Sequence, residues 1–578
     1  MTSSPTPERP PGPLSKPATV LLALFSLVTF TQSQSLYEML AGNTEMLALR
    51  LRSNWQLLEI VLAFNWLPAL LLFGLWWMLS RLHRSAGRVF LGVAFFLLSI
   101  VFFFQLDNAY FLDMGHGFSQ SYWLWVVPSL GLSLAILRFE KAFLAFVFAL
   151  SPGIVLFPLL FLGRTWADTS NYVPASVSAA QPAGPPPSAR SLPSIVIIVL
   201  DEFALPAMVD DAGQIDASRF PHFYALAQQS HWFRNATANA DHTIRSIPAL
   251  LTGNLPLPVG APTFRNYPEN LFTWLQPHYE IYVWETWTHF CVPRVFHCMG
   301  SLHEYTANRA DLFRDILTLY SERVLPGGIG AGYQSDNRTW ALQHDSHRLM
   351  PLRLAHFERF METISSFPAN EPFLLYFHHD LPHSPYWLSP DGVTRELSPP
   401  GFNLDMTGDA KTLAEMLERY RQQIMFVDRN LGQIIAALEA RDLYDDSLLI
   451  VLSDHGVSYR TEAPGRNLFE RGGRVANADL LLSVPLFIKL PHQRQGQVSD
   501  RDVQLIDVVP TLEVLLGLKV PWKVRGRDVF AESAPRQQKV AYDRRGHRYE
   551  FADDLGLRAL EYRLEPVTAT HHTSETRP

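Results

Sequence analysis

The chain has 578 residues, which is too long for one compact domain, so at least two units are expected. It is 48% hydrophobic but only 18% charged, and its net charge of -7 leaves no excess of basic residues. This composition argues against a nucleic-acid-binding protein, which normally carries a basic face. The two cysteines are too few for a cysteine-rich metal scaffold.

The apolar residues are concentrated before residue 163, in five stretches. They run roughly over 18–36, 56–80, 87–106, 121–137 and 142–163. A helix needs about 20 apolar residues to cross the hydrocarbon core of a bilayer. The second, third and fifth stretches meet this length comfortably, whereas the first and fourth are marginal. We predict a bundle of five transmembrane α-helices over residues 18–163; helices buried in a soluble core are the alternative.

Charged residues in the connections between these stretches predict the orientation. The second connection contains Arg81, Arg84 and Arg88 and no acid, whereas the third contains Asp107 and Asp113 and no base. By the positive-inside rule the N-terminus is then cytoplasmic. Five crossings place everything after residue 163 on the other side. We therefore expect a multi-pass membrane protein whose large domain lies outside the cytoplasm.

Three polar segments are predicted to lie outside the folded units. Residues 1–17 are rich in proline and polar side chains and are expected to be a disordered cytoplasmic tail. Residues 164–193, rich in Pro, Ala and Ser, are expected to link the membrane helices to the outer domain. Residues 564–578 are again polar and are expected to be disordered, which leaves residues 194–563 for the outer domain.

The outer domain alternates short apolar runs with helical patterns. Continuous β-branched or aromatic runs occur at 195–200, 373–377, 448–452 and 484–490. The clearest helical pattern, over 413–442, has apolar residues three and four positions apart. Alternation of this kind predicts an α/β domain with a mostly parallel central sheet. In such sheets the functional residues gather at the carboxyl ends of the strands.

Metal-ligating side chains follow two of these strands. Asp201 and Glu202 come directly after the first strand, and Asp454 and His455 follow another in the string VLSDHG. Carboxylates and imidazoles suit zinc or manganese. An acid at a strand end is often only a helix cap, but two clusters that both follow buried strands indicate a metal site.

A third motif, ADHTIRSIPALLTG at 240–253, lies between these clusters. The order of an aspartate after a strand, this motif and DHG resembles the alkaline phosphatase/sulfatase superfamily, and Thr243 stands at the nucleophile position. Sulfatases have there a Cys or Ser that becomes formylglycine, followed by Pro and Arg, whereas this chain has Ile244 and Arg245. In this respect it looks more like the membrane-anchored phosphoethanolamine transferases and lipoteichoic acid synthases, which use threonine and share the five-helix anchor.

The resemblance implies a set of metal ligands: Asp201, Thr243, Asp454 and His455. Phosphoethanolamine transferases usually carry Glu where this chain has Asp201, so Glu202 is an alternative or additional ligand. The implied metal is divalent, zinc first and manganese second. For Thr243 an ordinary role as a helix cap is the alternative.

The string FHHDLPHSPYW follows the strand at 373–377 and resembles the His-x-Pro segment of the superfamily. His383 is the matching residue, and the resemblance implies that it stabilises the charged oxygens of the transferred group or protonates the leaving group. His378, His379 and Asp380 are candidates for a second metal site. For His378 and His379 we favour simple packing and hydrogen bonding at the strand end.

One feature departs from the phosphoethanolamine transferases, which carry another histidine soon after DHG. The segment that follows DHG in this chain contains none. Arg466 or Arg471 is a candidate to supply positive charge, because guanidinium suits phosphate oxygens. Ordinary surface arginines are the alternative.

The two cysteines, Cys291 and Cys298, lie close together in the outer domain. In an oxidising compartment we expect them to form a short-range disulfide, with metal-bound thiolates as the alternative.

Taken together, these features predict an enzyme that transfers a phospholipid head group, such as phosphoethanolamine, through a phospho-threonine. The expected partners are a phospholipid donor and an envelope glycan or lipid acceptor, with no nucleic acid. One alternative is a periplasmic phosphodiesterase or sulfatase-type hydrolase. Another is a non-catalytic protein of envelope biogenesis.

Overall fold

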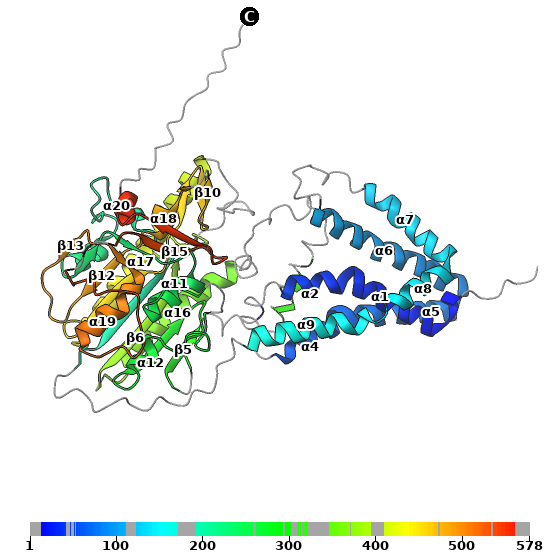
Figure 1. The fold of residues 1–578 in the computed structure, drawn as a ribbon, viewed down its shortest axis with the longest axis horizontal. Helices are drawn as coiled ribbons and strands as arrows, with labels where there is room; N and C mark the ends of the chain where they lie inside the picture. The colour runs from blue at the N-terminus through cyan, green and yellow to red at the C-terminus, as the bar shows by residue number, and fades with distance from the viewer. Residues whose placement is uncertain are drawn as a thin grey trace, which may run out of the picture. The chain divides into compact units, whose positions relative to one another are not determined.

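The structure is a computed structural model that describes residues 13–560 with internal gaps. The gaps are 42–46, 48–50, 52–53, 111–122, 171–191, 258–261, 293–294, 302–309, 311, 314–315, 318–319, 321–345, 370, 395–409, 472–473, 533 and 535. The chain divides into two units (Figure 1). The first comprises Met1–Ser170 and Thr306–Ala341, and the second comprises Asn171–Tyr305 and Leu342–Pro578.

The first unit is helical. Its elements are α1 (Pro17–Val28), η2 (Thr29–Ser33), α2 (Gln34–Ala41), α4 (Trp55–Val61), η3 (Leu62–Trp66), α5 (Leu67–Leu82), α6 (Arg84–Tyr110), α7 (Trp123–Arg138), α8 (Glu140–Leu150) and α9 (Gly153–Ser170). Four helical stretches are long and apolar enough to cross a membrane: Pro17–Ala41, Trp55–Leu82, Arg84–Leu106 and Glu140–Ala167. The predicted span at 121–137 corresponds to a shorter apolar helix, Leu124–Arg138. Five spans are therefore not confirmed.

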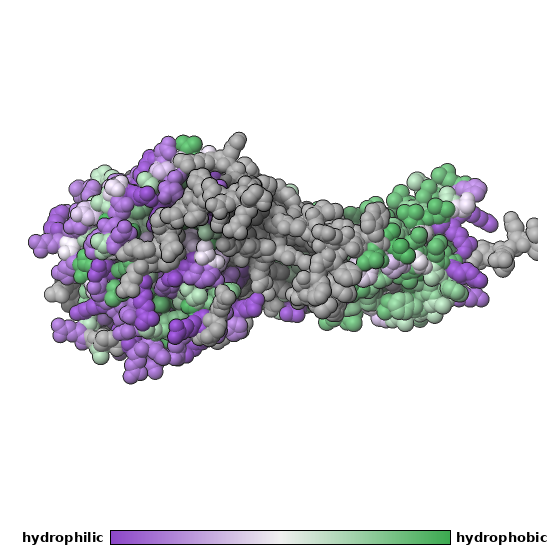
Figure 2. Space-filling view, turned by 90° about the horizontal axis from the view of Figure 1, so that it is seen from above, coloured by the Kyte–Doolittle hydropathy of each residue, from purple (hydrophilic) through white to green (hydrophobic). Residues whose placement is uncertain are grey.

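The surface of these helices is apolar, and hydrophobic colouring covers much of it in Figure 2. Large side chains such as Leu71, Val89, Val127 and Phe148 are more than half exposed. Water would make such a surface unfavourable, whereas lipid tails would not. The helices are therefore compatible with a membrane anchor.

Two boundaries differ from the predicted ones. Helix α9 continues to Ser170, so residues 164–170 are helical and only 171–193 remain of the predicted linker. Residues 13–15 form a short 3-10 helix at the end of the predicted N-terminal tail. The rest of that tail, most of the linker and the tail at 564–578 lie outside the described residues.

The second unit is built on an eight-stranded sheet. Its order is β13-β2-β12-β7-β1-β6-β4-β5. The bounds are β1 (Ile195–Asp201), β2 (His231–Phe233), β4 (Glu280–Glu285), β5 (His297–Ser301), β6 (Phe373–Pro382), β7 (Leu448–Ser453), β12 (Leu486–Lys489) and β13 (Gln497–Ser499). Only β12 runs antiparallel to its neighbours, and the other paired strands are parallel. The prediction of an α/β domain with a mostly parallel sheet is confirmed.

Four smaller strand pairs lie outside this sheet. They are β3 (Ala236–Thr237) with β14 (Val503–Gln504), β8 (Ser458–Arg460) with β9 (Ala463–Gly465), β10 (Glu470–Arg471) with β11 (Arg474–Val475), and β15 (Lys539–Tyr542) with β16 (Arg548–Phe551). The helices are α10 (Pro221–Ala227), α11 (Thr243–Thr252), α12 (Leu271–Leu275), α16 (Ser346–Ser366), α17 (Ala410–Glu439), α18 (Ala478–Leu482), α19 (Val508–Leu516) and α20 (Leu555–Leu560).

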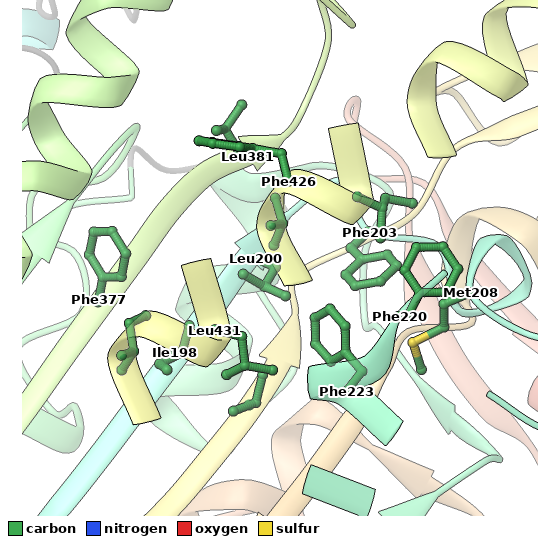
Figure 3. Packing of buried hydrophobic residues seen from close by; sticks show 14 of the residues in the cluster. Ile198, Leu200, Phe203, Met208, Phe220, Phe223, Phe377, Leu381, Phe426 and Leu431 are labelled. Carbon is green, nitrogen blue, oxygen red and sulfur yellow. The ribbon is translucent and has the colours of Figure 1, made fainter. Parts of the chain in front are cut away.

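Apolar residues cover both faces of the sheet. Successive side chains of a strand point to opposite faces, so Ile198 and Leu200 of β1 belong to one hydrophobic cluster and Ile197 to the other. On the first face these residues lie among Phe223 of α10 and Leu431 of α17 (Figure 3). Burial on both faces explains the continuous apolar runs in the sequence. It also leaves the ends of the strands as the place for polar side chains.

Gly456, the last residue of DHG, lies where two parts of the chain come close. A Cβ atom on this residue would stand 2.4 Å from the carbonyl oxygen of Leu480 and 2.9 Å from Cβ of Ala204. Backbone cannot move aside as easily as the end of a side chain. The glycine therefore allows the turn after β7 to pack closely.

We expect Gly456→Ala to lower the free energy of unfolding by about 1–3 kcal/mol, because the added methyl group overpacks this contact. Thermal unfolding of the purified chain in detergent, followed by circular dichroism, measures the change. An unfolding temperature equal to that of the parent chain would contradict this account of Gly456.

Candidate metal centre and nucleophile

Three adjacent strands bring two predicted ligands and one further histidine together. β7, β1 and β6 are neighbours in the sheet; Asp454 directly follows β7, Asp201 ends β1, and His378 lies within β6, level with Val199 of β1. All three side chains are fully buried. His378 Nε2 lies 3.7 Å from Asp201 Oδ2 and 3.9 Å from Asp454 Oδ2. His455, which follows Asp454, places its Nε2 at 3.7 Å from Asp454 Oδ2 and 3.8 Å from Asp201 Oδ1.

Several atoms of this group lack a hydrogen-bond partner. Asp454 Oδ1 accepts from the backbone N–H groups of His455 (2.8 Å) and Glu202 (3.1 Å). In contrast, Asp454 Oδ2, Asp201 Oδ2 and His378 Nε2 are buried with no partner among the described residues. They lie within 4.8 Å of one another. Buried polar atoms without partners are costly, so this arrangement fits a divalent cation.

The electrostatics of the group agree with this interpretation. Burial raises the pKa of Asp201 well above its ordinary value, and the negative charge of Asp454 raises it further. The negative charge of Asp454 thus disfavours the ionised form of Asp201. A cation held between them would stabilise both charges.

Thr243 lies beside this group as the first residue of α11. The N-cap position is occupied by His242, so the alternative that Thr243 is the helix cap is wrong. Its Oγ1 is 3.4 Å from Asp201 Oδ1 and 3.4 Å from His455 Nε2. The structure thus gathers Asp201, Thr243, Asp454 and His455, the four predicted ligands, at one place. The first amides of α11 also favour an anion here.

The orientation of His455 suits a metal ligand. Its Nδ1 lies 3.0 Å from the carbonyl oxygen of Gly456. Because a carbonyl only accepts, Nδ1 carries the hydrogen and donates it. Nε2 is then left with a lone pair directed at the carboxylates.

Comparison with known proteins agrees with these observations. A family model described as Sulfatase matches residues 193–518, which is more than half of the chain. The chain belongs to the sulfatase family.

Individual relatives are distant. An endo-4-O-sulfatase of Bacteroides thetaiotaomicron is 26% identical over 214 residues, 34% of this chain and 38% of that protein. The multifunctional alkaline phosphatase superfamily protein PehA of Trinickia caryophylli is 31% identical over 152 residues, 25% of this chain and 28% of that protein. A lipoteichoic acid synthase of Staphylococcus saprophyticus is 24% identical over 152 residues, 26% of this chain and 22% of that protein.

The matches therefore span less than two fifths of these relatives. Among solved structures, a phosphonate monoester hydrolase from Silicibacter pomeroyi covers 61% of this chain and 79% of its own, with 19% identity and a TM-score of 0.43. Members of the superfamily use a divalent metal. The group of Asp201, His378 and Asp454 is a possible site for it in this sulfatase-family chain.

Glu202 does not point into the metal group. Its backbone has a positive φ of 63°, which is uncommon for a residue with a side chain. Its carboxylate accepts from Tyr386 Oη at 2.5 Å and from Arg466 Nη1 at 3.2 Å. The carboxylate of Glu202 therefore fixes the side chain of Arg466, while the backbone N–H of Glu202 donates to the carboxylate of Asp454. The geometry disfavours Glu202 as a metal ligand.

His383 and Arg466 form one network. The Nδ1–H of His383 donates to the carbonyl oxygen of Ser384 at 2.7 Å, and its Nε2 accepts from Arg466 Nη1 at 2.7 Å. Burial lowers the pKa of His383 well below its usual value, and the charges of Arg466 and Arg353 lower it further. A neutral imidazole that already accepts from arginine is poorly suited to protonate a leaving group. The contacts favour a role in positioning Arg466.

Two of the three candidates for a second metal site, Asp380 and His379, have other partners. Asp380 pairs with the fully buried Arg353 and accepts from Trp287 Nε1 at 2.7 Å. His379 stacks on Phe357 and Phe377, as the packing interpretation predicted. His378 differs from that interpretation. Successive side chains of β6 point to opposite faces of the sheet. His378 therefore points away from the face that Phe377 and His379 share, and it reaches the metal group.

Three further residues named in the sequence analysis have simple outcomes. Cys291 and Cys298 form a disulfide, as expected. Arg471 ends β10, which pairs with β11, and its side chain lies outside the described residues.

Sequence reasoning missed His242, which precedes Thr243. Its Nδ1 lies 2.8 Å from Asp241 Oδ1, and the other oxygen of Asp241 accepts from the N–H of Leu468 at 2.9 Å. Burial lowers the pKa of His242, although the hydrogen-bonded Asp241 opposes this effect. The Asp-His pair directly before Thr243 was the available signal.

We expect Arg353→Met to lower the free energy of unfolding by about 3–5 kcal/mol, because it leaves Asp380 charged and buried without its partner. Chemical denaturation of the purified chain measures the change. The double variant Arg353→Met/Asp380→Asn should recover part of the loss. If the single and double variants were equally destabilised, the ion pair would not be the cause.

Proposed function

We propose that this sulfatase-family chain is a metal-dependent phosphotransferase that moves a phospholipid head group through a phospho-threonine. The observation that carries the proposal is the position of Thr243, whose Oγ1 faces Asp201 and His455 at the start of α11. Threonine cannot be converted to the formylglycine aldehyde of sulfatases. It can, however, carry a phosphate ester.

Asp201, Thr243, Asp454 and His455 are the residues that would hold the metal. A divalent ion there supplies positive charge next to the reacting phosphate and makes a coordinated hydroxyl more acidic. The residues of the chain supply the rest. Thr243 provides the nucleophilic oxygen, α11 provides N-terminal amides, and Arg466 provides a guanidinium for phosphate oxygens.

The proposed reaction has two steps. In the first, Thr243 Oγ1 forms a bond to phosphorus, the bond from phosphorus to the diacylglycerol oxygen breaks, and diacylglycerol leaves with a proton. In the second, a hydroxyl or phosphate of an envelope glycan or lipid attacks the same phosphorus. The Thr243 hydroxyl is then regenerated, and the head group is on the acceptor.

A membrane anchor suits this chemistry because the donor is itself a lipid. The apolar helices of the first unit would keep the second unit near its substrate. Similarity to a lipoteichoic acid synthase supports a membrane-linked reaction. We propose a bacterial inner-membrane location with the catalytic unit in the periplasm.

A hydrolase that acts on phosphate or sulfate esters is the second candidate. It is supported by the relatives, which include an endo-4-O-sulfatase. Water would then replace the acceptor in the second step, and the same phospho-threonine would serve. A non-catalytic role is disfavoured because the nucleophile and all four predicted ligands are present at one place.

Incubation of the purified chain with phosphatidylethanolamine and zinc should add one phosphoethanolamine group to Thr243, because its oxygen is the nucleophile. Intact-mass spectrometry detects the adduct. Thr243→Ala should abolish it. Thr252→Ala, at the other end of α11 where the hydroxyl bonds Pro248 O, should keep it.

An adduct on Thr243→Ala would refute the assignment. Adducts with phosphatidylglycerol alone would change the donor, and no adduct with either would favour the hydrolase.

Arg466→Met should reduce kcat/KM about 10²–10³-fold, the usual effect of removing one donor to a charged transition state. Arg466→Lys should restore only part of the activity, because an ammonium cannot reproduce the guanidinium contacts. Release of diacylglycerol from a fluorescent lipid measures the rate. Arg471→Met is the matched comparison and should stay near the parent rate. Equal losses in the two methionine variants would remove Arg466 from its proposed role.

A further inference from the structure

His378 stands apart from the four ligands discussed above. It lies on β6 and is fully buried. Its Nδ1 is 2.8 Å from Thr286 Oγ1, so the Nδ1–H can donate to that hydroxyl. Nε2 then keeps its lone pair and points between Asp201 and Asp454.

The distances from His378 Nε2 are those between ligands of one metal ion. At 3.7 and 3.9 Å from the two carboxylate oxygens, it is too far for a hydrogen bond. Atoms that each bind zinc at about 2.0–2.2 Å lie roughly 3–4 Å apart. His455 Nε2 shows nearly the same separations, 3.7 and 3.8 Å, from the same two carboxylates. The two histidines thus contact the carboxylate pair in equivalent ways.

The hydrogen bond to Thr286 accounts for Nδ1 of His378 but leaves Nε2 unexplained. Its Nε2, Asp201 Oδ2 and Asp454 Oδ2 lack hydrogen-bond partners among the described residues. Three buried, unsatisfied atoms at one point would destabilise the fold unless something binds them. By contrast, the adjacent His379 has its Nε2 3.1 Å from Asn430 Nδ2 and stacks between aromatic rings. Only one of the two neighbouring histidines is directed at the metal group.

We propose that His378 is a further metal ligand, so that two imidazoles, two carboxylates and the Thr243 hydroxyl surround one ion and favour zinc over manganese. Imidazole suits zinc, whereas a mainly oxygen site suits manganese or magnesium. The inference rests on the metal-dependent reaction proposed above. Its test, however, reads metal binding and not transfer, so either proposal can fail without the other.

The decisive experiment replaces each histidine by cysteine and uses cobalt as a spectroscopic probe. Both native cysteines are joined in the disulfide, so the new thiol is the sole free one. The full chain carrying His378→Cys should show a thiolate-to-cobalt charge-transfer band in the near ultraviolet when cobalt is bound. His379→Cys is the matched control and should show none. Cobalt bound to His378→Cys without this band would overturn the proposal.

A second variant distinguishes a loss of metal binding from a folding defect. His378→Gln should raise the dissociation constant for zinc at least 10-fold in chelator competition, with a smaller change for manganese. Its metal-free form should unfold at a temperature close to that of the metal-free parent, because Nε2 has no partner to lose and only the hydrogen bond of Nδ1 to Thr286 is removed. His379→Gln should retain the parent zinc affinity. Unchanged zinc affinity in His378→Gln would refute the proposal. A weaker zinc affinity would also refute it if the metal-free variant were destabilised by as much as the zinc-bound variant.

Discussion

The catalytic unit depends on the repulsion between two carboxylates, Asp201 and Asp454, buried at neighbouring strand ends. Such a pair is unfavourable by itself, because burial and like charge both disfavour ionisation. The surrounding chain offsets only part of this. Two backbone N–H groups hold one oxygen of Asp454 and leave the other free. The carboxylate pair therefore favours the binding of a positive charge, and the Thr243 hydroxyl lies beside it.

The other buried acids nearby are neutralised within the protein. Asp380 is paired with Arg353, and Glu202 contacts Arg466. Of four acids at or near the ends of β1, β6 and β7, two therefore have arginine partners and two do not. This division keeps the arginines from neutralising the metal group. It also fixes the guanidinium of Arg466 through Glu202 and His383.

The two units meet different physical demands. The first unit exposes large apolar side chains, a surface that lipid accommodates and water does not. The second buries its apolar residues on both faces of a sheet and collects its polar residues at the strand ends. A lipid substrate would connect the two, because its tails need the membrane and its head group needs the polar site.

The sequence by itself determined the α/β class and the mostly parallel sheet, because local patterns carry that information. Its motifs also named four candidate ligands that the structure gathers at one place. Buried strands are continuous apolar runs, and Asp201, Thr243, Asp454 and His455 lie in short motifs. It did not separate His378 from His379, since the direction of each side chain depends on which face of β6 it occupies and on what packs there. Nor did it show that Glu202 and Asp380 are bound to arginines from distant segments. Those partners lie 264 and 27 residues away in the chain, so only the tertiary structure could decide which acids remain for the metal.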